Sequence, residues 1–332
     1  MLLYKDIPAP VVNMEKLLII CGPTATGKTK LALQLAEKFN GEIISVDSRQ
    51  VYKHMDIGTG KDLPVNSKLE IRNSKLGGAY KVGGVYVWGY DLVSPKKEFS
   101  VAQYERTARL IIIGIWGRKK LPILTGGTGL YIKAVIDGIE TASIPKNVKL
   151  RESLEDRTVK ELFEMLSNID PVKSASLNLS DRKNPRRLVR AIEIAQHNLS
   201  GKAKKRQTAL KANILMIGLA VPKKILDERI KERVKKRINR GIEKEIEKLL
   251  KMGVNWNMQS MNTLGYKQWR EYLISKKTKK EVIDKWIKDE IQYTKRQNTW
   301  FKKEKRIQWF DISKRTYKKD IETEVKKWYP QE

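Results

Sequence analysis

The feature that most constrains the fold of this chain is a glycine-rich loop directly after a short apolar run. From Gly22 to Thr29 the sequence reads GPTATGKT, which has the spacing G-x-x-x-x-G-K-T. In this pattern, backbone N–H groups surround a phosphate and the lysine neutralises it. The run LLII before the loop suits a buried strand, and TKLALQLAEKF after it carries apolar residues at helical spacing. The sequence therefore predicts a phosphate site between a strand and the N-terminus of a helix.

We expect every residue of this loop to contribute to phosphate binding. Lys28 supplies a full positive charge, and the Thr29 hydroxyl is the predicted ligand of Mg²⁺. The predicted phosphate-binding residues are Gly22, Pro23, Thr24, Ala25, Thr26, Gly27, Lys28 and Thr29. An accidental glycine-rich turn is the alternative, but such a turn has no need of this lysine and threonine in a strand-loop-helix context.

The charge of the chain indicates a polyanionic partner. Among 332 residues, 68 are Lys or Arg and 38 are Asp or Glu, which gives a formal net charge of +30. A surface that became basic by drift in a lysine-rich proteome is the plainer reading. A membrane surface is another polyanion, but the longest apolar run, LIIIGIW at 110–116, is far shorter than the roughly 20 residues needed to span a bilayer. We expect no membrane association.

The N-terminus and the cysteine content favour a cytoplasmic protein. The opening MLLYKDIPAPVV has no cationic leader before an apolar block, so we expect a loose lead-in rather than a secretory signal. Cys21 is the only cysteine, which leaves no material for a disulfide or a cysteine-based zinc site.

The order of apolar runs predicts an α/β fold, a P-loop NTPase-like parallel sheet flanked by helices, with an inserted all-helical unit. Short buried strands are expected at 17–20, 42–46, 121–125 and 214–219, with a hairpin-like excursion within 60–90. Between 152 and 198, helical patterns follow one another with no strand. We therefore expect a P-loop α/β core at 1–140, a helical insertion at 141–210, and a return to the core with a basic helical C-terminal region at 211–332.

The residues alone leave the reaction open. Asp47 and Ser48 follow the second predicted strand at its carboxyl end, where open α/β sheets bind ligands. A P-loop beside a carboxylate suits a small-molecule kinase, in which Asp47 would bind Mg²⁺ or accept a hydroxyl proton. The carboxylate could equally accept a proton from an amine. With only His54 and His197 in the chain, acid–base chemistry is expected to fall to carboxylates.

Six motifs together resemble one family. GPTATGKT, DSRQVY with MDIGTG, GGTGLY, NPRRLVRAIEI, LGYKQ and YTKRQNTWF occur in the order and approximate spacing of the tRNA dimethylallyltransferases, over about residues 16 to 301. The resemblance implies that the P-loop holds the diphosphate of dimethylallyl diphosphate rather than ATP. It also implies transfer of the dimethylallyl group to N6 of the tRNA adenosine immediately following the anticodon.

The resemblance assigns roles to individual residues. Asp47 is implied as the base, Arg233 as a cation that stabilises the departing diphosphate with Lys28 and Mg²⁺, and Thr24 as a further hydroxyl at the substrate. Gln50 is implied as a reader of the adenine edge, and the helical insertion as a tRNA-binding domain. The residues expected to face the tRNA anticodon stem-loop are Asp47, Ser48, Arg49, Gln50, Thr128, Lys149, Arg186, Arg187, Arg190, Asn262, Gly265, Tyr266 and Lys267, followed by Lys295, Arg296 and Gln297 of YTKRQ.

The chain departs from the family pattern between residues 60 and 98. It has IGTGKD in place of IGTAKP, and a longer glycine-rich excursion without the usual His pair. The alternatives are a P-loop kinase, a transferase that prenylates free adenine nucleotides, and an RNA-binding protein without catalysis. The large positive charge argues against a free nucleotide as the substrate. The P-loop and Asp47 argue against an RNA-binding protein without catalysis. No self-complementary apolar stripe is apparent, so we expect a monomer.

Overall fold

A computed structural model describes residues 14–61, 63, 69–73, 77–201, 208–274 and 276–330. The predicted N-terminal lead-in lies outside these residues, apart from its end. Contacts within the chain separate it into two compact units, one formed by Met1–Ile136 with Leu210–Glu332 and the other by Asp137–Ala209.

The first unit is built on an eight-stranded sheet among the described residues, in the order β3-β4-β5-β2-β6-β1-β7-β8. From β5 to β8 every neighbouring pair is parallel, and β3 and β4 add an antiparallel edge. The strands are β1 (Lys16–Cys21), β2 (Gly41–Val46), β3 (Leu69–Asn73), β4 (Gly77–Val82), β5 (Val85–Trp88), β6 (Leu121–Gly126), β7 (Asn213–Ala220) and β8 (Ile307–Asp311). The predicted α/β fold with a mostly parallel sheet is confirmed.

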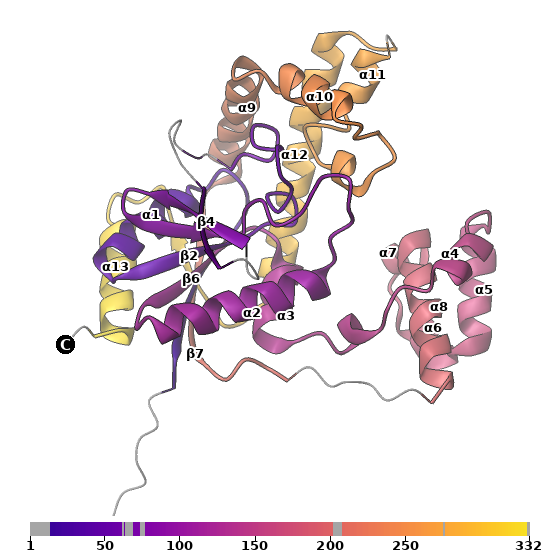
Figure 1. Cartoon of the computed structure of the whole chain (residues 1–332), viewed down its shortest axis with the longest axis horizontal. Coiled ribbons are helices and arrows are strands. Elements are labelled where there is room, and N and C mark those ends of the chain that lie inside the picture. The colour runs from indigo at the N-terminus through magenta and orange to yellow at the C-terminus, as the bar shows by residue number, and fades with distance from the viewer. Residues whose placement is uncertain are drawn as a thin grey trace, which may run out of the picture. The chain divides into compact units, whose positions relative to one another are not determined.

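Helices cover both faces of this sheet, because its central strands are apolar on both sides. Along β1, Leu18 and Ile20 pack toward α1 (Lys28–Lys38) and α13 (Tyr317–Trp328). Leu17 and Ile19 pack on the other side, in the core that includes α2 (Val101–Gly117) and α3 (Gly129–Asp137). Figure 1 shows α1 beside α13 and, across the sheet, α2 beside α3. The P-loop lies between β1 and α1, where the sequence predicted it.

A helical group follows β7 and completes this unit. It consists of α9 (Lys223–Asn239), α10 (Ile242–Lys251), α11 (Trp269–Leu273) and α12 (Lys279–Phe301). Helix α12 begins with a capping box, in which the Thr278 hydroxyl accepts from the Glu281 N–H and the Glu281 carboxylate accepts from the Thr278 N–H. Helix α9 packs against α12. No helix in the described ranges is long and apolar enough to cross a membrane.

The second unit contains only helices in its described part. These are α4 (Val148–Ser153), α5 (Val159–Ile169), α6 (Pro171–Ser176), α7 (Leu179–Arg182) and α8 (Pro185–Leu199), preceded by a 3₁₀ turn at Glu140–Ser143. Leu162 and Leu166 of α5 pack against Leu188 and Ile192 of α8 to form a small core of their own. This helix pair is therefore stabilised by burial that does not involve the sheet.

Two features of the sheet edges differ in how well the sequence predicted them. The expected hairpin forms from β4 and β5, whose two-residue connection, Gly83 and Gly84, has positive φ at both positions. Within the expected basic helical C-terminal region, the structure adds a strand that the sequence did not predict, β8, which pairs in parallel with β7 at the opposite edge. The sequence IQWFD in β8 is flanked by lysines and buries little besides Ile307, so its strand character depends on pairing with β7.

Candidate active site

The P-loop approaches the sheet closely through glycine. Gly22 has a φ of +133° and a Cβ at this position would come within 2.6 Å of the Leu219 carbonyl oxygen in β7. Gly27, at the start of α1, has a φ of +83°. Both backbone conformations disfavour any other residue. The backbone conformation of the loop thus requires glycine at both positions.

Lys28 lies where the loop passes into α1. Its Nζ donates to the Pro23 carbonyl at 2.6 Å, and the Thr26 hydroxyl donates to the same carbonyl at 2.9 Å. Burial, followed by the nearby Arg233 guanidinium, lowers the pKa of Lys28 to about 7. A bound anion would oppose both influences by its charge, so it would favour the ammonium form of Lys28.

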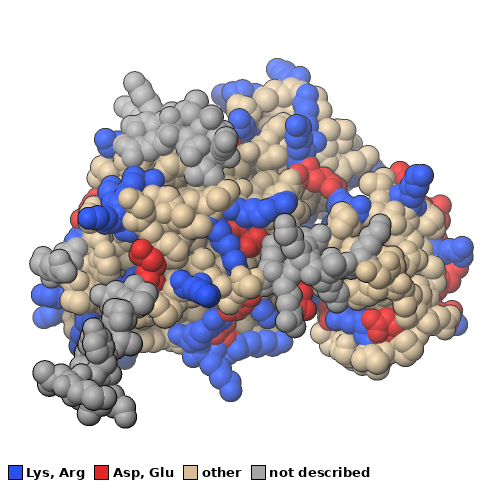
Figure 2. Space-filling model, turned by 60° about the horizontal axis from the view of Figure 1, so that its bottom comes forward, with Lys and Arg blue, Asp and Glu red and all other residues tan. Residues whose placement is uncertain are grey.

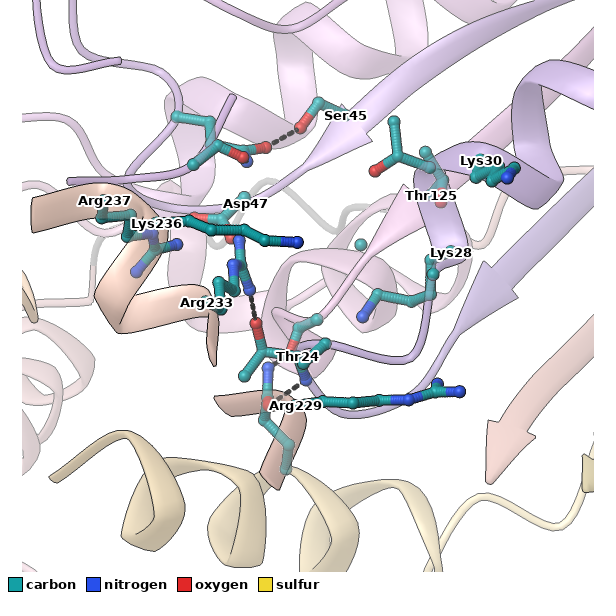
Figure 3. Close-up of a pocket in the computed structure, with 18 of the residues that line it drawn as sticks. Thr24, Lys28, Lys30, Ser45, Asp47, Thr125, Arg229, Arg233, Lys236 and Arg237 are labelled. Carbon is teal, nitrogen blue, oxygen red and sulfur yellow. Dashed lines mark hydrogen bonds between the residues drawn. The ribbon is translucent and has the colours of Figure 1, made fainter. Parts of the chain in front are cut away.

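A column of cations on α9 faces the loop. Arg229, Arg233 and Arg237 are spaced four residues apart, so they share one face of the helix. Arg233 Nη1 donates to the Thr24 hydroxyl. Figure 3 shows Lys28 and Arg233 entering the same cavity from the loop and from α9. Arg237 is only 5% exposed and donates to Glu290 at 2.9 Å, while its Nε is buried without a partner in the described part of the chain.

Asp47 lies at the carboxyl end of β2, beside Arg233 (Figure 3). Its Oδ1 accepts the backbone N–H of Arg49 at 2.8 Å. Burial raises the pKa of Asp47 above its ordinary value, while the backbone N–H groups of Arg49 and Gln50 and the Arg233 charge oppose that rise. A carboxylate whose pKa is raised in this way is a better proton acceptor near neutral pH than an exposed one.

Two cavities meet at these groups. The larger, of about 770 Å³, lies over the P-loop and is lined by Lys28 and Thr29 among others. The smaller, of about 240 Å³, opens between the end of β2 and the helical group. Five residues line both: Thr24, Asp47, Arg233, Arg237 and Tyr293. The structure thus brings three of the predicted catalytic residues to the junction and the fourth, Lys28, into the larger cavity.

The smaller cavity also collects some of the residues predicted to face tRNA. Ser48, Arg49, Asn262 and Lys267 line it. The Ser48 N–H donates to the Thr128 hydroxyl at 3.3 Å, which joins the end of β2 to the GGTG loop after β6. Lys267 and Asn262 are both exposed, as residues that reach a macromolecule must be.

Three predicted RNA-facing residues have other roles in the structure. The Gln50 amide accepts from the Ser45 hydroxyl at 2.7 Å and donates to the Gly60 carbonyl at 2.9 Å, so it already bridges β2 to the loop at 56–60. Tyr266 is fully buried, and its neighbour Gly265 approaches Trp286 so closely that a Cβ would come within 2.7 Å of the ring. These groups are used internally, and this use depends on partners that the linear sequence does not reveal.

Gln297 lines the larger cavity and is hydrogen-bonded within the fold. Its side chain is 6% exposed, and its amide accepts the Thr24 N–H at 2.9 Å while donating to the Gly127 carbonyl at 2.9 Å. Helix α12 thereby ties the P-loop to the loop after β6. Tyr293, one turn earlier on α12, was not singled out from the sequence, nor was Arg237. The recurrence of arginine every four residues on α9 was the available signal for Arg237.

The cations of the helical insertion fall into two groups. Lys149, Arg186 and Arg187 are exposed, although Arg187 also pairs with Asp181. Arg190 instead donates to the carbonyls of Thr141 and Ile144 at 2.7 and 2.8 Å and to Glu193 at 3.0 Å. The guanidinium of Arg190 therefore fastens the entering chain to α8, which is a structural role that the sequence motif did not predict.

The site fits a magnesium ion that takes most of its ligands from a substrate. Among the residues that the structure describes, no group of three His, Cys, Asp or Glu side chains could hold a metal ion. Thr29 does line the larger cavity beside Lys28. Mg²⁺ is commonly held by one or two protein oxygens together with phosphates and water, so this donor set suits it.

Comparisons with known proteins cover most of the chain. The family model of IPP transferase matches residues 50–304, and that of isopentenyl transferase matches residues 15–74. The chain is 38% identical to the tRNA dimethylallyltransferase of Anoxybacillus flavithermus over 90% of this chain and 91% of the relative. It is 38% identical to that of Carboxydothermus hydrogenoformans over 93% and 96%. The structure of a tRNA isopentenylpyrophosphate transferase from Bacillus halodurans aligns with a TM-score of 0.65 at 35% identity, covering 93% of this chain and 94% of that one.

Proposed function

Because the chain belongs to the tRNA dimethylallyltransferase family, we propose that it transfers a dimethylallyl group from dimethylallyl diphosphate to N6 of the tRNA adenosine immediately following the anticodon. The observation that carries this proposal is the meeting of the two cavities at Thr24, Asp47 and Arg233. The larger cavity takes the diphosphate through the P-loop. The smaller one takes the nucleoside, with the reacting atoms at the junction.

The transfer is a substitution at the first carbon of the dimethylallyl group. The adenosine N6 forms a bond to this carbon as the bond from the carbon to the diphosphate oxygen breaks. N6 loses a proton, which the Asp47 carboxylate accepts. The raised pKa of Asp47 suits this role because a stronger base takes the proton more readily.

The departing diphosphate gains negative charge on the oxygen that leaves the carbon. Lys28 and Arg233 face that charge from two sides, and both are in place before the reaction. Thr24 is held by Arg233 on its hydroxyl and by Gln297 on its N–H, which fixes its position at the junction. A Mg²⁺ ion held by Thr29 would supply further charge neutralisation on the phosphate oxygens.

The partner is the anticodon stem-loop of tRNA. An adenine in a stacked loop must be turned out to enter a pocket of this kind. On the face in Figure 2, the blue atoms of Lys and Arg cover more surface than the red atoms of Asp and Glu, as expected for a chain with a net charge of +30. We further propose that the enzyme acts as a monomer in the cytoplasm, where its single cysteine would stay reduced.

Replacing Asp47 with Asn tests the proposed base. Asn keeps the size of the side chain but cannot accept the proton, so prenyl transfer to tRNA should slow by about 10²-fold to 10⁴-fold. The affinity for diphosphate should stay close to that of the wild type. Asp284→Asn, which removes an exposed carboxylate from α12, is the matched control and should transfer at the normal rate. A wild-type rate in Asp47→Asn would reduce Asp47 to a turn-forming residue.

Two further incubations separate the alternatives. Wild-type protein with dimethylallyl diphosphate and tRNA should yield prenylated adenosine by mass spectrometry of the digested tRNA. Supplying AMP instead of tRNA should yield no prenylated nucleotide. If ATP hydrolysis dependent on Lys28 occurred without any prenyl transfer, the protein would be a kinase or another nucleotide-using enzyme.

A further inference from the structure

Glu245 lies outside both cavities and binds the loop at 56–60, which forms part of their walls. Glu245, on α10, accepts the backbone N–H groups of Asp56 and Ile57 on one oxygen, each at 2.8 Å. Its other oxygen accepts the Gly58 N–H at 3.1 Å and the Tyr266 hydroxyl at 2.6 Å. Four donors from two separate segments therefore converge on one carboxylate. Hydrogen bonds to an ionised acceptor are stronger than neutral ones, so this clamp fixes the loop firmly.

The clamped loop touches the groups at the junction of the cavities. A Cβ on Gly60 would come within 2.5 Å of an Nη2 atom of both Arg233 and Arg237. The Gly60 carbonyl also accepts from Gln50 at 2.9 Å. Gly58 lines the smaller cavity, and a Cβ there would overlap the Tyr266 ring. The backbone of 58–60 is thus packed between the Glu245 clamp on one side and the two arginines on the other.

We propose that Glu245 is a positioning residue for the transfer reaction, acting through the Asp56–Gly60 loop on Arg233 and Arg237. Both arginines lie on α9 and Glu245 lies on α10, so the loop contacts two successive helices. Releasing the loop would allow the guanidinium groups to shift relative to the P-loop. Displacements of about 1 Å at such groups can cost about 10²-fold in rate. This inference rests on the proposed function.

Glu245→Ala removes all four hydrogen bonds and is the primary test. Prenyl transfer at saturating substrates should slow by about 10-fold to 100-fold. Diphosphate affinity, measured by titration calorimetry, should change by less than about threefold, because Glu245 does not contact the P-loop. Hydrogen exchange at the amides of residues 56–58 should accelerate, which reports the clamp without reference to activity.

Tyr266→Phe is the second variant, and it keeps the buried ring while removing one donor. It should slow transfer less than Glu245→Ala does. In the Glu245→Ala background it should have no further effect, because its hydroxyl then has no carboxylate to reach. Glu247→Gln, an exposed carboxylate on the same helix, is the matched control and should behave as the wild type.

The outcomes distinguish this inference from the proposed function. Normal transfer by Glu245→Ala, with only its thermal stability lowered, would overturn the positioning role and leave the function intact. Loss of diphosphate binding in step with activity would overturn it too, since the whole site would then have collapsed. A Tyr266→Phe effect that persisted in the double variant would contradict the shared clamp. Failure of the wild type to prenylate tRNA would instead remove the proposed function itself.

Discussion

At the scale of single residues, Lys28 illustrates how much a motif predicts. Its place in the larger cavity follows from the loop pattern, because the loop is a continuous segment whose conformation is set locally. Its pKa of about 7 does not follow from the pattern, because it depends on burial and on Arg233, which lies far along the chain. The sequence predicts the position of Lys28, and the fold determines its pKa.

This pKa predicts a pH dependence of diphosphate binding. A bound anion favours the ammonium form and raises the pKa of Lys28 above the value of about 7 in the free protein. Binding should therefore be at full strength below about pH 7 and weaken as the pH rises above it, by up to about tenfold per pH unit. Lys28→Arg keeps its charge, so its affinity should fall less.

Titration calorimetry with inorganic diphosphate between about pH 6 and pH 9 checks this prediction. The difference between the two proteins is the quantity to examine, because ionisation of the ligand affects both equally. Parallel affinity profiles for the wild type and Lys28→Arg would show that Lys28 does not change its protonation over this range.

Residues whose roles depend on distant partners were not predictable in the same way. The predicted role of Gln50 is at the adenine edge, and the structure adds that its amide spans from Ser45 to Gly60. Arg190 was expected on phosphate, but it holds the carbonyls of Thr141 and Ile144. A motif identifies these residues. It does not show whether their side chains bind a ligand or form hydrogen bonds within the protein.

At the scale of elements, the local sequence pattern predicts a helix or strand that is strongly apolar or capped. It does not predict an element whose conformation depends on pairing with a neighbour. Strands β1, β2, β6 and β7 were predicted from apolar runs that are buried on both faces. Strand β8 escaped prediction because only its pairing with β7 gives it an extended conformation. The two cavities could not be predicted from the sequence either, because they form where α9 and α12 lie beside the P-loop.

Gln297 on α12 allows a test of how far one element depends on another. Replacing Gln297 with Met keeps the length of the side chain but removes its bonds to the Thr24 N–H and the Gly127 carbonyl. Each bond contributes about 0.5 to 1.5 kcal/mol, so losing both should lower the diphosphate affinity by roughly 5-fold to 150-fold if the P-loop depends on this bridge. Thr299→Ala, an exposed change on the same helix, is the control. Unchanged affinity in Gln297→Met would show that the loop keeps its conformation alone.

At the scale of the whole molecule, the excess positive charge should appear as salt dependence of tRNA binding. Each phosphate contact that releases a counterion adds about 0.7 to 0.9 to the slope of log affinity against log salt concentration. Arg186 and Arg187 are exposed on α8, whereas the donors of Arg190 are engaged within the helical unit. Replacing Arg186 and Arg187 with Ala should therefore weaken binding and flatten the slope by about 1 to 2 units.

The matched control removes the same charge elsewhere. Lys318 and Lys319 are exposed on α13, so their replacement by Ala lowers the net charge equally. Binding measured from about 50 to 300 mM salt should give a flatter line for the arginine pair and an unchanged slope for the lysine pair. Equal slopes for the two double variants would mean that only total charge matters and that α8 makes no phosphate contact.

The helical insertion leaves and rejoins the core at one place, since the Leu210 N–H donates to the Ile136 carbonyl at 2.8 Å. Between these two residues the chain can grow or shrink without moving either end, and a longer excursion costs little additional closure entropy. Evolution can therefore treat the insertion as an exchangeable module, altering its length and its charged surface while the P-loop, Asp47 and the α9 arginines stay where they are. Under the predicted role of the insertion in binding tRNA, recognition of RNA and chemistry on the prenyl donor would diverge at different rates within one chain.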